Sequence, residues 1–323
     1  MKTIFSGIKP TGDLHLGNYF GALSQWVDLQ HDHHSIFCVV DYHAITVPQD
    51  KKALHNNIIA IARSYLAAGI DPKKSIIFRQ SDIKEHTELA WILNCTSARM
   101  SDLENMTQYK DAASKQINPS VGLFDYPILM AADILLYNTD TVPVGHDQLQ
   151  HVELARDLAK RFNHDYGETF KIPSALIRSE GSRIMGLDDP TKKMSKSIGE
   201  NNCISLNDSP EVATKKIMRA ATDSDTVIKY DPANKPGISN LLTILSILEN
   251  KKIKDLEKEF TDCGYGQFKQ RIANSVSKFL TNFQEKAKHY SDEQVLTILA
   301  DGQKQVEPLA ATVLAKVRTQ LGL

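Results

Sequence analysis

Apolar runs alternate with helical patterns over the first half of the chain, and together they predict a parallel sheet. Continuous apolar runs suit strands that are buried on both faces, and strands that alternate with helices are typical of right-handed crossovers. We therefore expect an α/β fold with a Rossmann-like parallel-sheet domain. Strands are expected over residues 3–6, 35–40, 75–79 and 139–144, and helices from residue 16, over 55–68, from Pro127 and from about 149 to 162.

Beyond about residue 172 the strand signal fades and helical patterns dominate. Prolines and glycines interrupt residues 172–197, which we interpret as a mobile loop. Helices follow over residues 209–221, with Ser209 as the cap and Pro210 at the first position, over 239–249 and from about 267 to the end. We expect a Rossmann-like catalytic domain over residues 1–188 and an all-helical domain over 189–302. The terminal helix, about 303–323, is a candidate to pack back on the first domain.

The composition is that of an ordinary globular chain and leaves the partner open. The 323 residues are 41% hydrophobic and 24% charged, with a net charge of -1, which argues against a generally basic nucleic-acid binder. The cysteines are too scattered for a disulfide framework or a zinc knuckle, so buried free thiols are expected at Cys38, Cys95, Cys203 and Cys263. No signal-peptide core or bilayer-length apolar run is evident, so we expect a cytoplasmic protein without a membrane partner.

Residues 4–21 are predicted to form a strand, a glycine-rich loop and the start of a helix, in that order. This arrangement is typical of phosphate-binding sites. Free backbone N–H groups and the helix dipole favour an anion at such a start. Gly17 permits close approach of a ligand, and His15 and Asn18 can donate hydrogen bonds. An ordinary capped helix start explains this stretch about equally well.

The lysines of a second segment, Lys193-Met194-Ser195-Lys196-Ser197, can bring positive charge to a polyphosphate. A solvated lysine run is the alternative. A third feature is Asp133, the one charged residue in the apolar stretch over residues 128–137. It is either a recognition group or an ion-paired core acid.

Together, His15-Leu16-Gly17-Asn18 and the lysine segment resemble the HIGH and KMSKS motifs of class I aminoacyl-tRNA synthetases, the second letter for letter. Four further segments look like bacterial-type tryptophanyl-tRNA synthetases: residues 5–12, 129–137, 142–148 and 236–242. The resemblance covers nearly the whole chain. It implies a ligase that activates L-tryptophan with Mg²⁺-ATP and transfers it to the 3′ end of tRNA(Trp). It also implies a homodimer, a helical domain that reads the anticodon, and no tightly bound cofactor or separate metal site.

The resemblance also implies roles for particular residues. Charge on the transferring phosphate would be stabilised by His15, Lys193, Ser195 and Lys196. ATP would be surrounded by Lys9, Pro10, Thr11, Gly17, Asn18, Gly145, His146, Asp147, Ile184, Lys193, Met194, Ser195, Lys196 and Ser197. For a lone residue such as Ile184 or Met194, plain core packing is the simpler explanation.

The implied tryptophan pocket centres on Asp133, which would accept the indole N–H. Indole offers one donor and no acceptor, so a buried carboxylate would favour tryptophan over phenylalanine. The remaining pocket residues would be Phe5, Tyr126, Met130, Ile134, Val142, Val144, Gln148 and His43. Taken singly, Tyr126, Gln148 and His43 are each better explained by ordinary packing or capping.

The chain departs from the family pattern at a few positions. Lys9 stands where glutamine is usual, His146 where glutamate is usual, and Ile198-Gly199-Glu200 where Asp-Pro is frequent. Two rival readings stay open: a tyrosine-specific synthetase or small nucleotidyltransferase, and a catalytically quiet paralogue that binds tryptophan or RNA. Asp133 and the helical C-terminal region argue against the first, and the intact lysines argue against the second.

Overall fold

The computed structural model describes residues 1–107, 110, 118–177, 184–195 and 198–323. The chain divides into two compact units. The sheet unit comprises Met1–Gly12, Trp26–Arg178 and Ser291–Leu323, and the helical unit comprises Asp13–Gln25 and Ser179–Tyr290. These units differ in extent from the expected domains of residues 1–188 and 189–302. Residues 13–25 and 179–188 group with the helical unit, and residues 291–302 group with the sheet unit.

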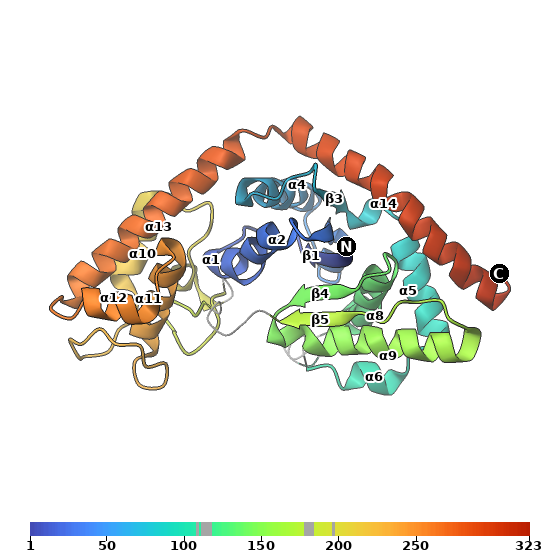
Figure 1. Cartoon of the computed structure of the whole chain (residues 1–323), viewed down its shortest axis with the longest axis horizontal. Helices are drawn as coiled ribbons and strands as arrows, with labels where there is room; N and C mark the ends of the chain where they lie inside the picture. The colour runs from blue at the N-terminus through green and yellow to red at the C-terminus, as the bar shows by residue number, and fades with distance from the viewer. Residues whose placement is uncertain (108–109, 111–117, 178–183, 196–197) are drawn as a thin grey trace. The chain divides into compact units, whose positions relative to one another are not determined.

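A five-stranded parallel sheet forms the centre of the sheet unit, in the order β3-β2-β1-β4-β5 (Figure 1). Every described strand pair is parallel, and β1 aligns Ile4 with Ser35 of β2 and with Thr141 of β4. The predicted α/β fold class is confirmed. The strands are β1 (Lys2–Ile8), β2 (His33–Val39), β3 (Ser75–Arg79), β4 (Thr141–Val144) and β5 (Ser174–Ile177).

Helices join and cover these strands, and local signals set their ends. In α4 the Asp50 side chain accepts the N–H of Ala53 at 2.9 Å, and the helix ends at Gly69, whose φ of 109° is left-handed. The helices of the sheet unit are α2 (Ser24–Leu29, which begins in the helical unit), α3 (Asp41–Ala44), α4 (Lys51–Ala68), α5 (Glu85–Thr96), α6 (Met100–Glu104), α8 (Val121–Leu135), α9 (Leu149–Tyr166) and α14 (Asp292–Leu321). Short 3₁₀ turns follow β3 and β4 at Gln80–Asp82 and His146–Gln148.

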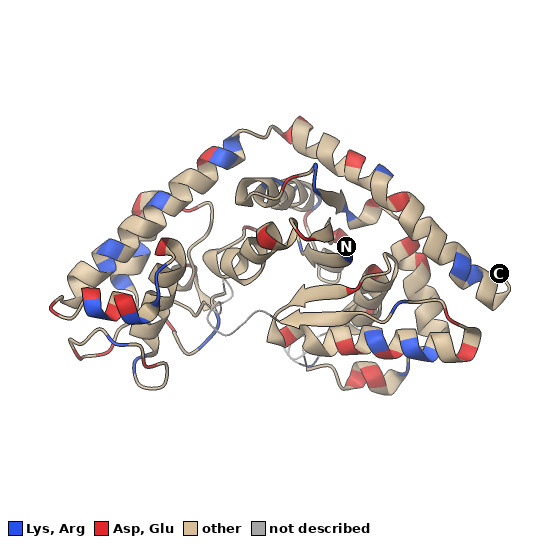
Figure 2. Ribbon diagram, viewed as in Figure 1, with Lys and Arg blue, Asp and Glu red and all other residues tan. Residues whose placement is uncertain are grey.

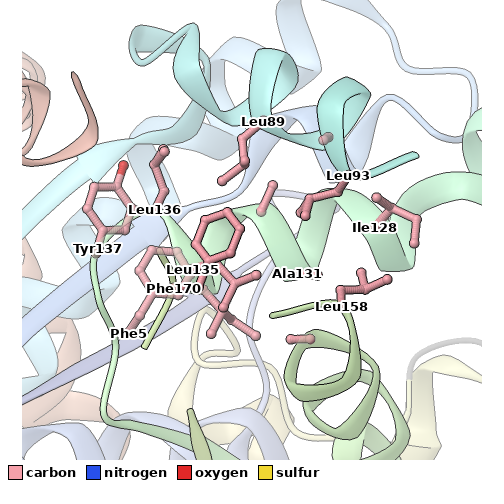
Figure 3. Packing of buried hydrophobic residues seen from close by; sticks show 14 of the residues in the cluster. Phe5, Leu89, Leu93, Ile128, Ala131, Leu135, Leu136, Tyr137, Leu158 and Phe170 are labelled. Carbon is pink, nitrogen blue, oxygen red and sulfur yellow. The ribbon is translucent and has the colours of Figure 1, made fainter. Parts of the chain in front are cut away.

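The core of the sheet unit lies between the sheet and α5, α8 and α9. Figure 3 shows Leu89 and Leu93 of α5 close to Ile128 and Leu135 of α8. The stretch that contains Asp133 is therefore surrounded by apolar side chains. Within the described residues, no helix combines the length and apolar composition needed to cross a bilayer.

Two sequence predictions in the sheet unit are wrong. Pro127 does not open α8, because the helix begins at Val121, where the Ser120 hydroxyl accepts the N–H of Leu123. A proline inside a helix costs about 3 kcal/mol, and the complete burial of Ile128 and its apolar neighbours offsets this cost. Residues 174–177, interpreted as part of a loop, form β5. This four-residue edge strand is only partly buried, and its apolar run of three residues is too short to mark a strand in the sequence.

The helical unit confirms the helix at residues 210–219, with Ser209 as its cap and Pro210 at its start. The helix expected from residue 16 contains a π-helical turn, a geometry often found at functional sites. The elements of this unit are α1 (Leu16–Asn18), the π turn (Tyr19–Leu23), a 3₁₀ turn (Glu200–Asn202), α10 (Pro210–Arg219), α11 (Pro236–Glu249), α12 (Ile253–Glu259) and α13 (Tyr265–Lys288).

All four cysteines are free, as expected, but only two are buried. Cys38 and Cys203 are buried, whereas Cys95 is exposed and Cys263 is intermediate. The prediction of buried thiols is therefore wrong for Cys95 and Cys263.

The last helix, α14, packs against β3, α4 and α5 (Figure 1). Gly302 makes this contact very close, because a Cβ added there would lie 1.9 Å from the Ile77 carbonyl oxygen. The helix therefore touches the backbone of β3 just before the polar turn at Gln80.

We predict that Gly302→Ala destabilises the sheet unit. The added methyl group meets backbone rather than a mobile side chain, so we expect a loss of about 1–3 kcal/mol, visible as a lower Tm. Gly122→Ala in α8 is the control, because its Cβ would meet only the Ser120 hydroxyl oxygen, at 3.8 Å. Equal Tm values for the two variants would contradict the close contact.

Candidate active site

A buried carboxylate, Asp133, lies at the centre of a hydrogen-bond network in the sheet unit. Its Oδ2 is 2.7 Å from His43 Nε2, and its Oδ1 is 2.6 Å from His86 Nδ1. Gln80 Nε2 donates to both oxygens, at 2.8 Å to Oδ1 and 3.0 Å to Oδ2. Behind His86, the Tyr137 hydroxyl lies 2.8 Å from Nε2. Donors from α3, the turn after β3, and α5 therefore converge on one side chain of α8.

These contacts use the full accepting capacity of the carboxylate. Two oxygens offer about four lone-pair positions, and the network places one contact at each. The Tyr42 N–H donates to Gln80 Oε1 at 3.0 Å, and this hydrogen bond orients the amide so that its Nε2 faces Asp133. Burial alone would raise the pKa of Asp133, but the charge of His86 and hydrogen bonds from His43 and His86 outweigh it and lower the pKa. Asp133 is therefore held ionised in an apolar surrounding.

The expected apolar pocket residues lie in or against the core next to Asp133. Phe5 is stacked on Tyr137 with ring centroids 5.5 Å apart, and both rings appear together in Figure 3. Met130 is only partly buried and packs against the cluster. The buried members of the predicted set are Phe5, Ile134, Val142 and Val144.

A second polar group surrounds Tyr126 on α8. Its hydroxyl lies 2.8 Å from His151 Nε2, and the Lys9 ammonium lies 5.3 Å from its ring centroid. Burial raises the pKa of Tyr126 to about 12 and is the main cause that lowers the pKa of His151 to about 4. Desolvation also lowers the pKa of Lys9, although part of its surface is exposed. The ring of His43 lies 6.2 Å from that of Tyr126, which links this group to the Asp133 network.

In the helical unit, the two sequence motifs lie together. A Cβ added at Gly17 would lie 3.0 Å from the His15 ring and 3.4 Å from Met194 Cβ, so only glycine fits without displacing the ring. Asn18 Oδ1 accepts the N–H of His15 at 3.1 Å. Met194 is held by its N–H, which donates to the Ile184 carbonyl at 3.0 Å. Residues distant in sequence are thus brought into contact.

The other expected ATP residues vary in exposure. Lys193 is exposed and Ser195 is partly buried, whereas Ile184 and Met194 are buried. Lys196 and Ser197 lie outside the described residues. In the sheet unit, Pro10 is buried and Thr11 exposed, and the segment after β4 is exposed at Gly145, His146, Asp147 and Gln148.

Sequence reasoning missed three members of the Asp133 network and one partner of Tyr126. Gln80 could have been found, because it directly follows a predicted strand, at the sheet edge where parallel α/β folds bind ligands. His86 and His151 lie in helices and give no such signal. Tyr137 belongs to a segment singled out by resemblance, but no role was assigned to it.

Comparison with known proteins identifies relatives along the whole chain. A family model described as tRNA synthetases class I (W and Y) matches residues 1–281. The chain is 50% identical to the tryptophan–tRNA ligase of Oceanobacillus iheyensis, covering 100% of this chain and 99% of that protein.

Solved structures of tryptophanyl-tRNA synthetases are also similar to this chain over its whole length. The tryptophanyl-tRNA synthetase of Mycoplasma pneumoniae is 38% identical, with a TM-score of 0.94 and coverage of 100% of this chain and 98% of that chain. The Campylobacter jejuni enzyme complexed with ADP and tryptophan is 37% identical, with a TM-score of 0.85 and full coverage of both chains.

We predict that Asp133→Asn lowers stability most at neutral pH. The substitution turns an amide toward existing N–H donors, so we expect a loss of about 3–5 kcal/mol at pH 7. Because the folded-state pKa of Asp133 is lowered, its contribution is fully present above the unfolded pKa of about 3.9 and is lost progressively as the pH falls from there through the lower folded-state pKa. Denaturant unfolding from pH 7 to pH 3 should show the two proteins converging.

Asp125→Asn, in the same helix, is the matched control. Burial raises the pKa of Asp125, so its substitution should give the opposite pH trend. A constant difference between native protein and Asp133→Asn at every pH would contradict an ionised, stabilising Asp133.

Proposed function

The chain belongs to the class I tRNA synthetases for tryptophan and tyrosine, and we propose that the Asp133 network selects tryptophan as its substrate. Its activity is that of a tryptophan–tRNA ligase, an ATP-using enzyme that joins tryptophan to tRNA. The observation that carries the proposed role is the ionised carboxylate of Asp133, surrounded by apolar side chains and facing N–H donors.

Tryptophan recognition requires a place for the indole N–H on a carboxylate that is already fully hydrogen-bonded. The longest of the four contacts is the 3.0 Å bond from Gln80 to Oδ2, and Gln80 retains its 2.8 Å bond to Oδ1 if that contact is given up. We therefore assign the indole N–H to Oδ2, beside His43. Phenylalanine has no donor for this position, and a tyrosine would have to reach it with a hydroxyl in place of the indole N–H.

The amino-acid end of the substrate is assigned to the group around Tyr126. Among the residues that the structure describes, no carboxylate lies within ion-pairing distance of Lys9, and its ammonium instead faces the Tyr126 ring. A cation in this position suits the carboxylate of tryptophan or a phosphate of ATP. Gln148 and the Tyr126 hydroxyl are proposed to contact the α-amino group, with the apolar pocket formed by Phe5, Met130, Ile134, Val142 and Val144.

The reaction begins with attack of the tryptophan carboxylate on the α-phosphorus of Mg²⁺-ATP, which expels pyrophosphate. A ribose hydroxyl of the 3′-terminal adenosine of the tRNA then attacks the carbonyl carbon of the adenylate, which forms the tryptophanyl ester and releases AMP. Fixed positive charge and N–H donors are the main source of catalysis in such transfers. This role is proposed for His15, Gly17, Asn18, Lys193, Ser195 and Lys196, while Lys9, Pro10, Thr11, Gly145, His146, Asp147, Ile184, Met194 and Ser197 are proposed to hold ATP.

Binding of tRNA(Trp) by the helical unit would depend on local basic residues. The charged positions of α13, coloured on the ribbon in Figure 2, are basic except for Glu285, whereas the net charge of the whole chain is only -1. On α10, Lys216 is paired with Asp208 at 2.7 Å, whereas Lys215 and Arg219 are exposed. The exposed pair are the better candidates for phosphate contacts.

A homodimer is proposed from a cluster of exposed apolar side chains on the sheet unit. Trp91 is 70% exposed, Val121 81% and Ile45 57%. Asn94, one turn after Trp91, bonds Asp125, one turn after Val121, at 2.9 Å, and Ser120 donates to the Thr46 carbonyl. Exposed apolar surface of this kind marks interfaces, with tryptophan a frequent anchor.

We predict exchange of labelled pyrophosphate into ATP that depends on tryptophan and is not supported by tyrosine or phenylalanine. Lys193→Ala should lower kcat about 10²–10³-fold, since it removes charge that acts on the transferring phosphate. Lys192→Ala is the control, because this neighbouring exposed lysine is paired with Asp189 instead. No exchange with any amino acid would favour the quiet-paralogue reading, and exchange with tyrosine alone would overturn the proposed selectivity.

We predict that Trp91→Glu weakens self-association at least about tenfold, because it places a charge at the proposed interface. Analytical ultracentrifugation at micromolar concentration should give a native dimer and a largely monomeric variant. Leu309→Glu, at an exposed apolar position on α14, should remain dimeric. A monomeric native protein, or equal association of the native and Trp91→Glu proteins, would contradict this interface.

A further inference from the structure

A buried asparagine on α11 makes its hydrogen bonds to the backbone of the segment that leads to the lysine motif. Asn240 is 4% exposed. Its Oδ1 accepts the N–H of Met185 at 2.9 Å, and its Nδ2 donates to the carbonyls of Met185 at 2.9 Å and Gly186 at 3.3 Å. The side-chain amide therefore pairs with Met185 much as a neighbouring strand would.

Met185 also pairs with Lys193 on its other side. The two residues form an isolated antiparallel bridge. Around it, Gly186 N–H donates to the Lys192 carbonyl at 2.8 Å, and Met194 N–H donates to the Ile184 carbonyl at 3.0 Å. The backbone of Lys193 is thus fixed to a strand-like segment that Asn240 holds in place.

A second buried asparagine fixes the turn between these two segments. Asn202 is 0% exposed, and its Oδ1 accepts the N–H groups of Asp188 and Asp189 at 3.1 and 3.0 Å. It packs so closely that a Cβ at Gly186 would lie 2.2 Å from Oδ1. The hairpin over residues 184–194 therefore has one asparagine at its turn and another along its first arm.

The helix that carries Asn240 is itself anchored beside the hairpin. At its start, Gly237 lies so close to the Ala221 carbonyl that a Cβ there would be 2.2 Å from the oxygen. The Ala221 N–H donates to the carbonyl of Leu187 at 2.8 Å, and Leu187 belongs to the same hairpin. Ser239 Oγ accepts the N–H of Asp231 at 2.8 Å. Residues 236–242, singled out in the sequence without a role, thus form the support of the lysine segment.

We propose that Asn240 is a positioning residue that sets the place of Lys193 relative to the first motif in the helical unit. The inference rests on the proposed role of Lys193. Lysine side chains are flexible, so the position of the Lys193 backbone determines which positions its ammonium group can reach near the transition state. Met194, next to Lys193, contacts Gly17 of the first motif, so a shift of the hairpin changes the distance between the two groups of phosphate ligands.

The test uses Asn240→Ala in the full-length protein. We expect kcat of tryptophan-dependent pyrophosphate exchange to fall about 10²-fold, the effect of displacing a catalytic group by roughly 1 Å. The dissociation constant for tryptophan should stay unchanged, because Asp133 and Tyr126 lie in the sheet unit. Hydrogen exchange measured by mass spectrometry should be faster over residues 184–194.

Two further variants separate positioning from general stability. Thr243→Val removes another buried polar group of α11, a hydroxyl bonded to the Ser239 carbonyl at 2.8 Å, and should leave kcat and hairpin exchange unchanged. Asn240→Asp keeps the acceptor for Met185 N–H but turns a carboxylate toward two carbonyls, so it should loosen the hairpin even if Asn240→Ala does not fold.

A lower Tm with native kcat and native hairpin exchange in the Asn240 variants would overturn the proposal, as would an equal loss of tryptophan affinity. Absence of exchange activity in the native protein would instead contradict the proposed function. In that case hydrogen exchange alone decides: unchanged protection over residues 184–194 in the Asn240 variants overturns the role of Asn240, and faster exchange supports it.

Discussion

The buried charge of Asp133 is the constraint around which the sheet unit is arranged. An ionised carboxylate in an apolar surrounding is tolerated only when hydrogen bonds replace its water, and these come from His43, Gln80 and His86. The donors come from three segments that follow or flank the ends of β2 and β3. The hydrogen bonds that the Asp133 carboxylate requires therefore hold those segments against α8. We propose that an incoming N–H donor exchanges with the longest of these contacts, the one from Gln80 to Oδ2.

In the helical unit, backbone contacts hold the segment that carries Lys193 beside the first motif. Here the backbone, rather than a buried charge, is held. Asn240 and Asn202 replace the hydrogen bonds that a larger sheet would supply to the hairpin over residues 184–194. Gly17 and Gly186 provide the space that these close contacts require. Buried polar groups serve both units: we propose that one arrangement selects a substrate group and that the other positions a catalytic one.

Much of this fold follows from local patterns, because buried parallel strands and capped helices leave strong signals. Residues 75–79 and the Ser209 cap were predicted because an apolar run and a Ser-Pro start depend on few distant contacts. Pro127 was misplaced because its cost is offset by core packing that the sequence does not display. β5 was missed because its apolar run of three residues is too short to mark a strand. In the site, Asp133 stood out as a charge in an apolar stretch, whereas the donor role of His86 depends entirely on tertiary contacts.

We propose above all that Asp133 selects tryptophan through the indole N–H. The most direct measurement compares kcat/KM for tryptophan with that for β-(3-benzothienyl)alanine, in which sulfur replaces the N–H in a ring of similar shape. The account predicts a loss of about a hundredfold for the analogue, since the desolvated carboxylate gains no donor from it. Equal kcat/KM values for the two amino acids would contradict the account.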